Sequence, residues 1–159
     1  MAGTGSIPLE GALGFPHTYH VAGELVKKGV KSCKVNLDSV MVKEGLRAQP
    51  AMDVLQWDAI KNPCLRDGSV DVILSDLPFG RRSGSKSDNR KLYPDLLLSM
   101  ARLVRPDTGR AVLLTQDKTS MFMSLKRVDR FWTSSKPIVT NIGGLTALVF
   151  VLVRTCLKP

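Results

Sequence analysis

The chain has 159 residues, and its 43% hydrophobic content can furnish a core, which suits one globular domain and argues against extensive disorder. Its 23 basic against 14 acidic residues give a formal charge of +9, which favours an anionic partner such as RNA over an acidic small substrate. The three cysteines, Cys33, Cys64 and Cys156, show neither metal-ligand spacing nor a disulfide framework, so we expect reduced thiols and no metal site.

The first expected element is a glycine turn that enters a helix. Gly3, Thr4 and Gly5 come directly before the expected helix, which contains Pro8. Glycines let the backbone approach a ligand closely, and Pro8 suits a first helical turn because its missing N–H would have had no partner there. A dinucleotide-binding fingerprint requires a third glycine in place of Pro8 and a strand ahead of Gly3, and neither is present.

An acidic residue follows the glycine turn at the sequence spacing expected for a ribose-binding acid. Residues 20–24 are predicted to form a strand that ends at Glu24, about where an acid that binds a ribose hydroxyl is expected. A helix over residues 27–42 and a strand over residues 52–56 come next. Gly3, Thr4, Gly5 and Glu24 are therefore candidate cofactor-binding residues.

The sequence Asp76-Leu77-Pro78-Phe79 follows a predicted buried strand over residues 70–75. The Asp76 carboxylate and the Leu77 carbonyl can each accept one N–H of an exocyclic amine, which turns its lone pair out of the ring plane, and Asp76 can take the released proton. Pro78 fixes the backbone and Phe79 offers a face for a base removed from its stack. The pattern predicts methyl transfer to an amino group on a base; the structural alternative is a strand that ends in a turn.

A basic segment follows this motif. Its five cationic residues, interspersed with Gly and Ser, are predicted to form a mobile loop that holds phosphates beside the base pocket. The alternative for any one of them is a solvated connecting loop. These candidate RNA-binding residues are Arg81, Arg82, Lys86, Arg90 and Lys91.

The rest of the chain continues the alternation of strands and helices. Helices are expected over residues 92–104 and 119–127, and strands over residues 111–115, 138–141 and 145–153, with Gly143-Gly144 closing a hairpin between the last two. Such alternation predicts an α/β sheet. The apolar run 145–153 is too short for a membrane helix. With no cleavable signal at the N-terminus, the cytosol is favoured and the nucleus is left open.

Longer strings resemble a known family. Gly3 to Ala12, Gln56-Trp57-Asp58, Ser75 to Gly80 and Gly109 to Asp117 occur in the order seen in the THUMP-domain-containing tRNA guanosine N2-methyltransferases, and Asn141 to Thr155 also matches. These are class I methyltransferases with an Asp/Asn-Pro-Pro-aromatic motif, in which Leu77 here replaces the first proline.

The resemblance implies a Rossmann-like α/β sheet of the class I S-adenosylmethionine-dependent methyltransferases with a C-terminal antiparallel hairpin. It implies that S-adenosylmethionine is the cofactor and that Asp58 accepts from its adenine amine, with Trp57 beside the adenine. The structural roles weighed against these are a turn cap for Asp58 and core packing for Trp57. The implied partners are tRNA, held near its acceptor end, and a small zinc-binding activator subunit that extends the sheet edge.

The chain also departs from this family. It starts within the glycine motif, so we expect one partial catalytic domain over residues 1–159 without the family's THUMP region and without the first strand of the sheet. Loss of a central strand would expose two ladder edges and remove part of the core, so the activity of this fragment is kept separate from the activity of the family. Rival activities with the same motif are methylation of the adenine N6 amine and of a protein glutamine. A non-catalytic remnant that binds RNA or a protein is the rival from a different class.

Overall fold

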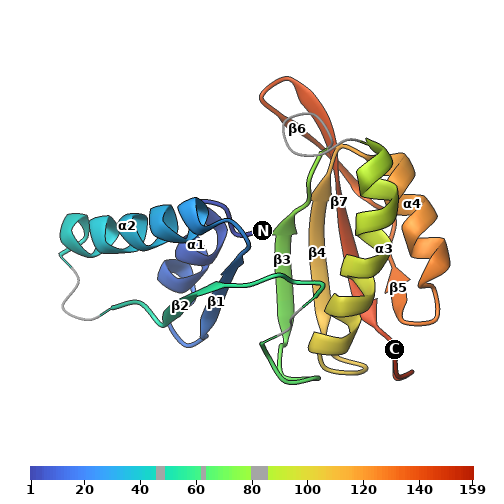
Figure 1. The fold of residues 1–159 in the computed structure, drawn as a ribbon, viewed down its shortest axis with the longest axis horizontal. Helices are drawn as coiled ribbons and strands as arrows, with labels where there is room; N and C mark the ends of the chain where they lie inside the picture. Colours follow the sequence, from blue (N-terminus) through green and yellow to red (C-terminus); the bar gives the residue numbers. More distant parts are fainter. Residues whose placement is uncertain (46–48, 62–63, 80–85) are drawn as a thin grey trace. The chain divides into compact units, whose positions relative to one another are not determined.

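The computed structural model describes residues 1–45, 49–61, 64–79 and 86–159, and for Lys86 the backbone alone. The chain divides into two compact units, unit 1 over Met1–Asn62 and unit 2 over Pro63–Pro159. The elements of both units are labelled in Figure 1. The expectation of one domain over residues 1–159 therefore stays a prediction.

Unit 1 consists of two helices and a parallel pair of strands. The strands pair in register from His20 opposite Met52 to Glu24 opposite Gln56. Parallel pairing requires a crossover, which the second helix supplies. The elements in chain order are α1 (Ser6–Gly14), β1 (His20–Glu24), α2 (Lys27–Lys43) and β2 (Met52–Gln56).

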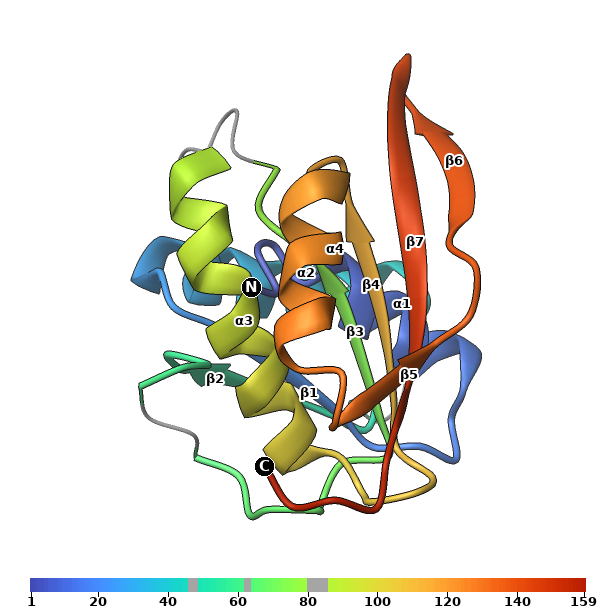
Figure 2. The same ribbon diagram turned by 90° about the vertical axis from the view of Figure 1, so that its right-hand side faces the viewer.

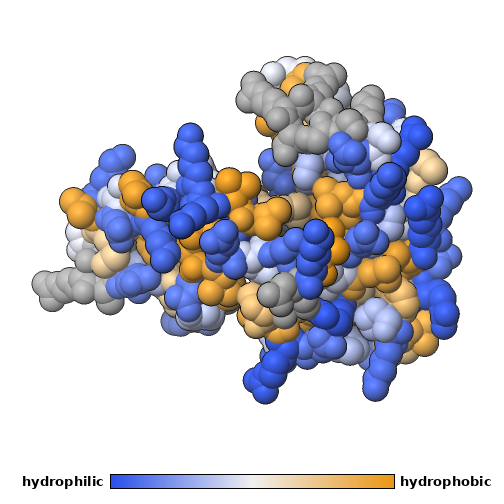
Figure 3. All heavy atoms as spheres, in the orientation of Figure 1, coloured by the Kyte–Doolittle hydropathy of each residue, from blue (hydrophilic) through white to orange (hydrophobic). Residues whose placement is uncertain are grey.

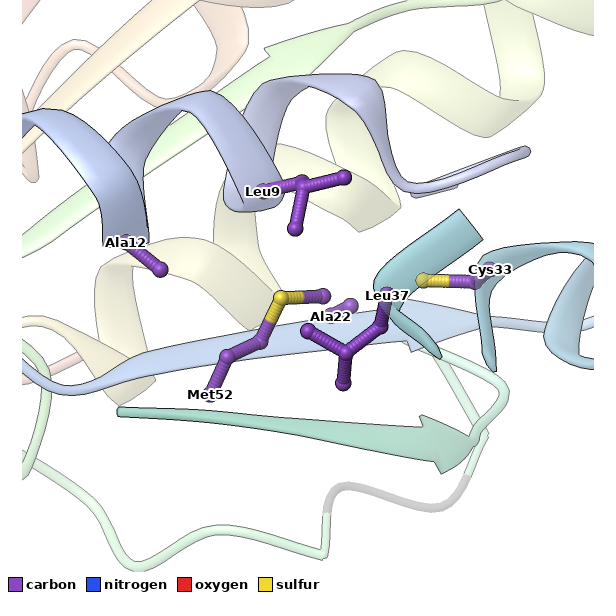
Figure 4. Packing of buried hydrophobic residues seen from close by; sticks show 6 residues of the cluster. All are labelled: Leu9, Ala12, Ala22, Cys33, Leu37 and Met52. Carbon is purple, nitrogen blue, oxygen red and sulfur yellow. The ribbon is translucent and has the colours of Figure 1, made fainter. Parts of the chain in front are cut away.

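The core of unit 1 lies between its helices and strands. Its members are buried apolar side chains, each at most 8% exposed, and all are drawn in Figure 4. They come from all four elements, so each helix is fixed to the strands by apolar packing. The cluster contains Leu9, Ala12, Ala22, Cys33, Leu37 and Met52.

Unit 2 is built on a mixed sheet with the order β3-β4-β7-β5, and β6 also pairs with β7. The β3–β4 pair is parallel, whereas every pair that involves β7 is antiparallel. The strands are β3 (Val72–Asp76), β4 (Arg110–Thr115), β5 (Trp132–Ser134), β6 (Ile138–Ile142) and β7 (Leu145–Arg154).

Two helices, α3 (Lys86–Leu103) and α4 (Lys118–Arg127), lie against one face of this sheet, as Figure 2 shows. From β7, Arg154 donates through Nε to the carbonyl of Ala101 in α3 at 2.6 Å. The rings of Phe122 in α4 and Phe150 in β7 meet edge to face at 5.4 Å. Trp132 packs in the core of unit 2, because this side chain is 4% exposed and its Nε1 donates to the carbonyl of Leu97.

The prediction of a buried strand at residues 70–75 is wrong in part. The strand runs over Val72–Asp76, and Val70 forms only an isolated bridge with Val104. Val72 is 50% exposed and Leu74 is 52% exposed. Among the described residues β3 pairs with β4 alone, so the strand has one unpaired edge and its apolar side chains are incompletely covered.

Most other predicted elements are confirmed with small shifts at their ends. The strands at residues 20–24 and 52–56 have the predicted bounds, and the C-terminal hairpin turns at Gly143 and Gly144, both with positive φ. The helix expected from residue 92 begins at Lys86. Its first two turns were not predicted because they are polar and carry no apolar periodicity. The short strand β5 was not predicted.

Candidate functional site

The glycine turn and Glu24 come together in unit 1. Gly3 and Gly5 have φ of 58° and 84°, and Gly5 is the N-cap of α1. The Gly3 N–H donates to Glu24 Oε2 at 2.8 Å, and the Val26 N–H donates to Glu24 Oε1 at 2.9 Å. The turn and the end of β1 are thus joined through one carboxylate. Thr4 is exposed, and its carbonyl accepts from the Asn36 amide at 3.0 Å.

The charge of Glu24 is stabilised by its surroundings. Burial acts to raise the pKa of this carboxyl, but the N–H groups of Val26 and Gly3 and the α-amino group of Met1 outweigh it, so the pKa lies below its ordinary value. The α-amino nitrogen lies 3.3 Å from Glu24 Oε2. Glu24 is therefore an ionised acceptor at neutral pH.

Trp57 and Asp58 directly follow β2. The Trp57 ring lies against Gly23. A Cβ added to Gly23 would come within 2.5 Å of Trp57 Cε3. Asp58 Oδ1 accepts from the N–H groups of Ile60 and Lys61 at 3.0 and 3.1 Å, which lowers the pKa of this carboxyl. Asp58 thus does cap a turn, while its Oδ2 accepts no hydrogen bond within the described part of the chain.

Two observations fit a bound nucleoside cofactor in unit 1. The buried Nε1 of Trp57 has no hydrogen-bond partner among the described residues, although a buried indole N–H normally has one. A Cβ built on Gly3 would meet no atom within 4 Å, so the turn there is open. Gly5 also has a packing reason to be glycine, because its Cβ would lie 2.1 Å from Cys33 Sγ.

The predicted catalytic turn lies in unit 2, at the carboxyl end of β3. Asp76 is the last residue of the strand, and partial desolvation raises the pKa of its carboxyl. The Leu77 side chain is buried at 3% exposure, and its N–H donates to the Leu114 carbonyl at 2.9 Å. Within the described residues, nothing donates to the Asp76 carboxylate or to the Leu77 carbonyl. Both therefore remain available as acceptors.

A buried polar network anchors the next residue of the turn. The Pro78 carbonyl accepts from Asn89 Nδ2 at 3.0 Å and from the Tyr93 hydroxyl at 2.5 Å. The Tyr93 hydroxyl also lies 2.8 Å from Thr115 Oγ1, and Asn89 Nδ2 donates to Asp117 Oδ2 at 3.0 Å. The turn is thus tied through Pro78 to α3 and to the end of β4.

Burial keeps the Tyr93 hydroxyl of this network neutral, so that it can donate a hydrogen bond. Desolvation raises the pKa of this hydroxyl to about 12, and the nearby charges of Asp117 and Asp76 also raise it, against the lowering effect of Thr115. Asp117 Oδ1 accepts from the Ser120 N–H at 3.1 Å and so caps α4. The anchor of the turn and the start of α4 share this carboxylate.

Sequence reasoning assigned no role to the residues of this network. Asn89 and Tyr93 are separated by four positions and hence share a helix face that is buried, at 1% and 0% exposure. The signal that could have identified them is a pair of polar residues on the buried face of an expected helix, close behind the motif. Asp117 ahead of Lys118-Thr119-Ser120 fits a helix N-cap signature.

The predicted basic loop is only partly described. Arg81 and Arg82 lie outside the described residues, and so does the side chain of Lys86. Arg90 and Lys91 are exposed and lie in the second turn of α3, so the stretch that begins at Lys86 is helical rather than a loop. Exposed cations thus remain close in sequence to the turn.

Metal clusters and membrane-spanning helices are absent from the part of the chain that the structure describes. Residues 1–45, 49–61, 64–79 and 86–159 contain no group of three or more His, Cys, Asp or Glu side chains that could hold a metal ion. No helix in those ranges has the length and apolarity required to cross a membrane.

The candidate residues follow the carboxyl ends of parallel strands in each unit: Glu24 ends β1, Trp57 and Asp58 follow β2, and Asp76 ends β3. This is where ligands bind in open α/β sheets, so the fold places the candidate residues where an α/β enzyme binds its ligands. A family model described as RMKL-like, methyltransferase domain matches residues 1–143. The chain belongs to this RMKL-like methyltransferase family, which confirms the class predicted from the sequence.

Comparison with curated proteins gives a consistent result. The chain is 45% identical, over 98% of its length, to "tRNA (guanine(6)-N(2))-methyltransferase THUMP3" from Bos taurus and 42% identical to the Homo sapiens protein of that name. It is 32% identical, over 74% of its length, to "U6 snRNA (guanine-N(2))-methyltransferase THUMPD2" from Bos taurus. The chain spans 31% of the Bos taurus THUMP3 protein and 21% of THUMPD2.

Solved structures share the fold. TrmN from Thermus thermophilus superimposes with a TM-score of 0.76 at 27% identity, over 97% of this chain and 42% of that one. Magnesium protoporphyrin IX methyltransferase ChlM from Synechocystis PCC 6803, solved with bound SAM, has a TM-score of 0.70 over 97% of this chain and 67% of that one. Its 12% identity shows the fold alone.

Proposed function

We propose that this chain carries the catalytic part of an enzyme that methylates the exocyclic N2 amine of guanosine in tRNA. The turn at Asp76 is the observation that carries the proposal, because its Pro78 carbonyl is anchored while the Asp76 carboxylate and the Leu77 carbonyl stay available. The likeness to proteins named tRNA (guanine(6)-N(2))-methyltransferase supports guanosine as the nucleoside.

The turn acts on the nucleophile. The N2 amine of guanine is a weak nucleophile because its lone pair is delocalised into the ring. If Asp76 and the Leu77 carbonyl accept its two N–H groups, the lone pair turns out of the ring plane toward the methyl donor. The raised pKa of Asp76 suits it to take the proton released after transfer. The half-buried ring of Phe79 offers a face to the flipped base.

S-adenosylmethionine is the proposed cofactor, and it supplies an electrophilic methyl group on a sulfonium. In unit 1 the open turn at Gly3, Thr4 and Gly5 would receive it, and Glu24 would accept from its ribose. Asp58 Oδ2 would accept from the adenine amine, with Trp57 packed beside the ring. The unpartnered Trp57 Nε1 and the open space at Gly3 support this placement.

The proposed partners are tRNA and, by family resemblance, a small zinc-binding activator subunit that extends a sheet edge. Among the described residues β2 pairs only with β1, and β6 pairs only with β7. Their outer edges carry the unpaired N–H and C=O groups that such an extension requires. The acceptor-stem region of tRNA as the target and the cytosol as the compartment also remain proposals.

The decisive experiment is methylation of RNA with labelled S-adenosylmethionine followed by nucleoside analysis. Unmodified tRNA and U6 snRNA are offered in parallel, since both RNA classes occur in the names of relatives. N2-methylguanosine in tRNA, lost in Asp76→Ala, is expected. N6-methyladenosine in the RNA, methylglutamine in a protein substrate offered to a parallel reaction, or undiminished methylation by Asp76→Ala would contradict the proposal.

A non-catalytic chain that binds RNA or a protein is the second candidate. It is favoured by one observation: β1 and β3 each pair with a single strand among the described residues, so strand edges remain open. Thermal unfolding with S-adenosylhomocysteine separates the two candidates. At about a hundredfold excess over Kd a cofactor-binding chain gains about 2.7 kcal/mol, and Asp58→Ala should lose this gain. A transition indifferent to the ligand would favour the second candidate.

A further inference from the structure

The outward face of α4 is unusual for a surface helix. Its exposed residues include two large apolar side chains, Phe122 at 47% and Met123 at 44% exposure. They lie between lysines in a hollow of about 390 Å³. We call this the α4 face, and its residues are Lys118, Thr119, Phe122, Met123 and Lys126. In the view of Figure 3, hydrophobic side chains reach the surface of unit 2 among hydrophilic ones.

The charge of this helix has one sign. The sequence of α4, from Lys118 to Arg127, contains three cations and no acidic residue. Within the described residues none of the three cations forms a salt bridge, and the whole chain carries +9. An anionic partner would therefore meet unpaired positive charge on both sides of an apolar strip.

The order of residues along the helix suits a nucleic acid strand. Lys118, Phe122 and Lys126 recur every four residues and therefore form one line about 12 Å long, with the aromatic ring between two cations. The Phe122 ring is fixed by its edge-to-face contact with Phe150, with an interplanar angle of 74°. A ring held in place loses little freedom when a base stacks on it.

The α4 face also begins close to the candidate catalytic turn. Lys118 follows Asp117, which caps α4 and accepts from Asn89, and Asn89 donates to the Pro78 carbonyl. RNA that presents a nucleotide to the turn would therefore have its flanking residues near the start of α4. This position favours RNA over an acidic peptide.

We propose that the α4 face binds a single-stranded segment of the RNA substrate next to the methylated nucleotide, with a base on Phe122 and phosphates on Lys118 and Lys126. The proposal rests on the proposed function for the identity of the RNA. Its chemistry is the combination of stacking and phosphate contacts that proteins use for single strands.

Binding of a fluorescein-labelled oligouridine, followed by anisotropy at several salt concentrations, tests the proposal. Lys118→Gln with Lys126→Gln touches no core residue and should reduce the slope of log K against log salt by about 1.4, or 0.7 per lost phosphate contact. The matched control, Lys31→Gln with Lys34→Gln on the exposed side of α2, should leave the slope unchanged. Phe122→Leu keeps an apolar group against Phe150 and should weaken binding at least about fivefold.

The outcomes separate this proposal from the proposed function. Unchanged affinity and slope in both α4 variants, or equal losses in the α2 control, would overturn the proposal. If tRNA is not methylated but the α4 variants lose RNA affinity as stated, the proposed function fails and the α4 face stands as an RNA site. If tRNA is methylated but RNA affinity does not change in the α4 variants, the proposed function stands and the α4 proposal fails.

Discussion

Tyr93→Phe is the most informative single change, because it removes one oxygen from the network that anchors the catalytic turn. The ring of Tyr93 is fully buried, and phenylalanine keeps its packing. The lost hydroxyl donates to the Pro78 carbonyl at 2.5 Å and lies 2.8 Å from Thr115 Oγ1. The variant therefore tests polar anchoring separately from core volume.

The magnitude follows from what remains bonded. A hydrogen bond contributes about 1 kcal/mol net, and a buried group left without any partner costs about 1–3 kcal/mol. Here Pro78 keeps the bond from Asn89, and Thr115 Oγ1 still accepts from the Asp117 N–H at 3.0 Å. The expected loss in unfolding free energy is therefore about 1–2 kcal/mol, a fall in Tm of roughly 2–8 °C for a chain of this size.

Thermal and urea unfolding measure this loss, with Tyr19→Phe as the matched control. Tyr19 is 64% exposed and its hydroxyl donates to the Asp53 carboxylate, so its variant should change stability by less than about 0.5 kcal/mol. Equal effects of the two variants would refute the anchoring argument.

The raised pKa of Tyr93, about 12, adds a pH signature. The folded state holds this proton more tightly, so the wild type loses stability relative to Tyr93→Phe as pH rises from about 10 through 12.

Three further results are expected. Gly5→Ala should destabilise the chain by at least about 2 kcal/mol in urea unfolding, because its φ is 84° and the new Cβ would meet Cys33 Sγ at 2.1 Å; Gly14→Ala, with open space around it, should not. Glu24→Gln should abolish a stability gain that the wild type has above the ordinary pKa of 4.5 and loses as pH falls through the lowered folded value, seen in pH-dependent melts. Asp76→Asn should lower kcat at least about a hundredfold and remove the acid limb that the raised Asp76 pKa gives to the pH–rate profile; a persistent limb would assign it to another group.

Local patterns predicted the elements of the fold where periodicity was clear. The strands at residues 20–24 and 52–56 and the helix at residues 119–127 were predicted to within one residue of their observed ends, and the helix at residues 92–104 was predicted from its apolar periodicity. The burial of β3 was not predictable in this way, because an apolar run shows what a strand is suited to pack against and not which neighbours are present. Val72 and Leu74 are apolar strand residues, yet both are about half exposed. The three-residue strand β5 is too short to show a period of two.

Some residues of the candidate site could likewise be predicted from the sequence, and others could not. Asp76 and Leu77 could be proposed from the sequence because each offers an acceptor to an amine, which is chemistry that a few adjacent residues can show. The anchors of the turn come from positions 11 and 15 residues after Pro78 and from beyond β4. Sequence reasoning could only have found Asn89 and Tyr93 by asking why polar groups occur on the buried face of an expected helix.

The Asp117 carboxylate makes the turn and α4 mechanically dependent on each other. One oxygen accepts from Ser120 and fixes the first turn of α4, while the other accepts from Asn89, which donates to Pro78. A displacement of α4 would have to break or carry this pair of bonds, and each is buried where water cannot replace it. An RNA strand on the α4 face would therefore hold in place the same residues that hold the Pro78 carbonyl, and substrate contacts outside the base pocket would favour the geometry in which Asp76 and Leu77 receive the amine.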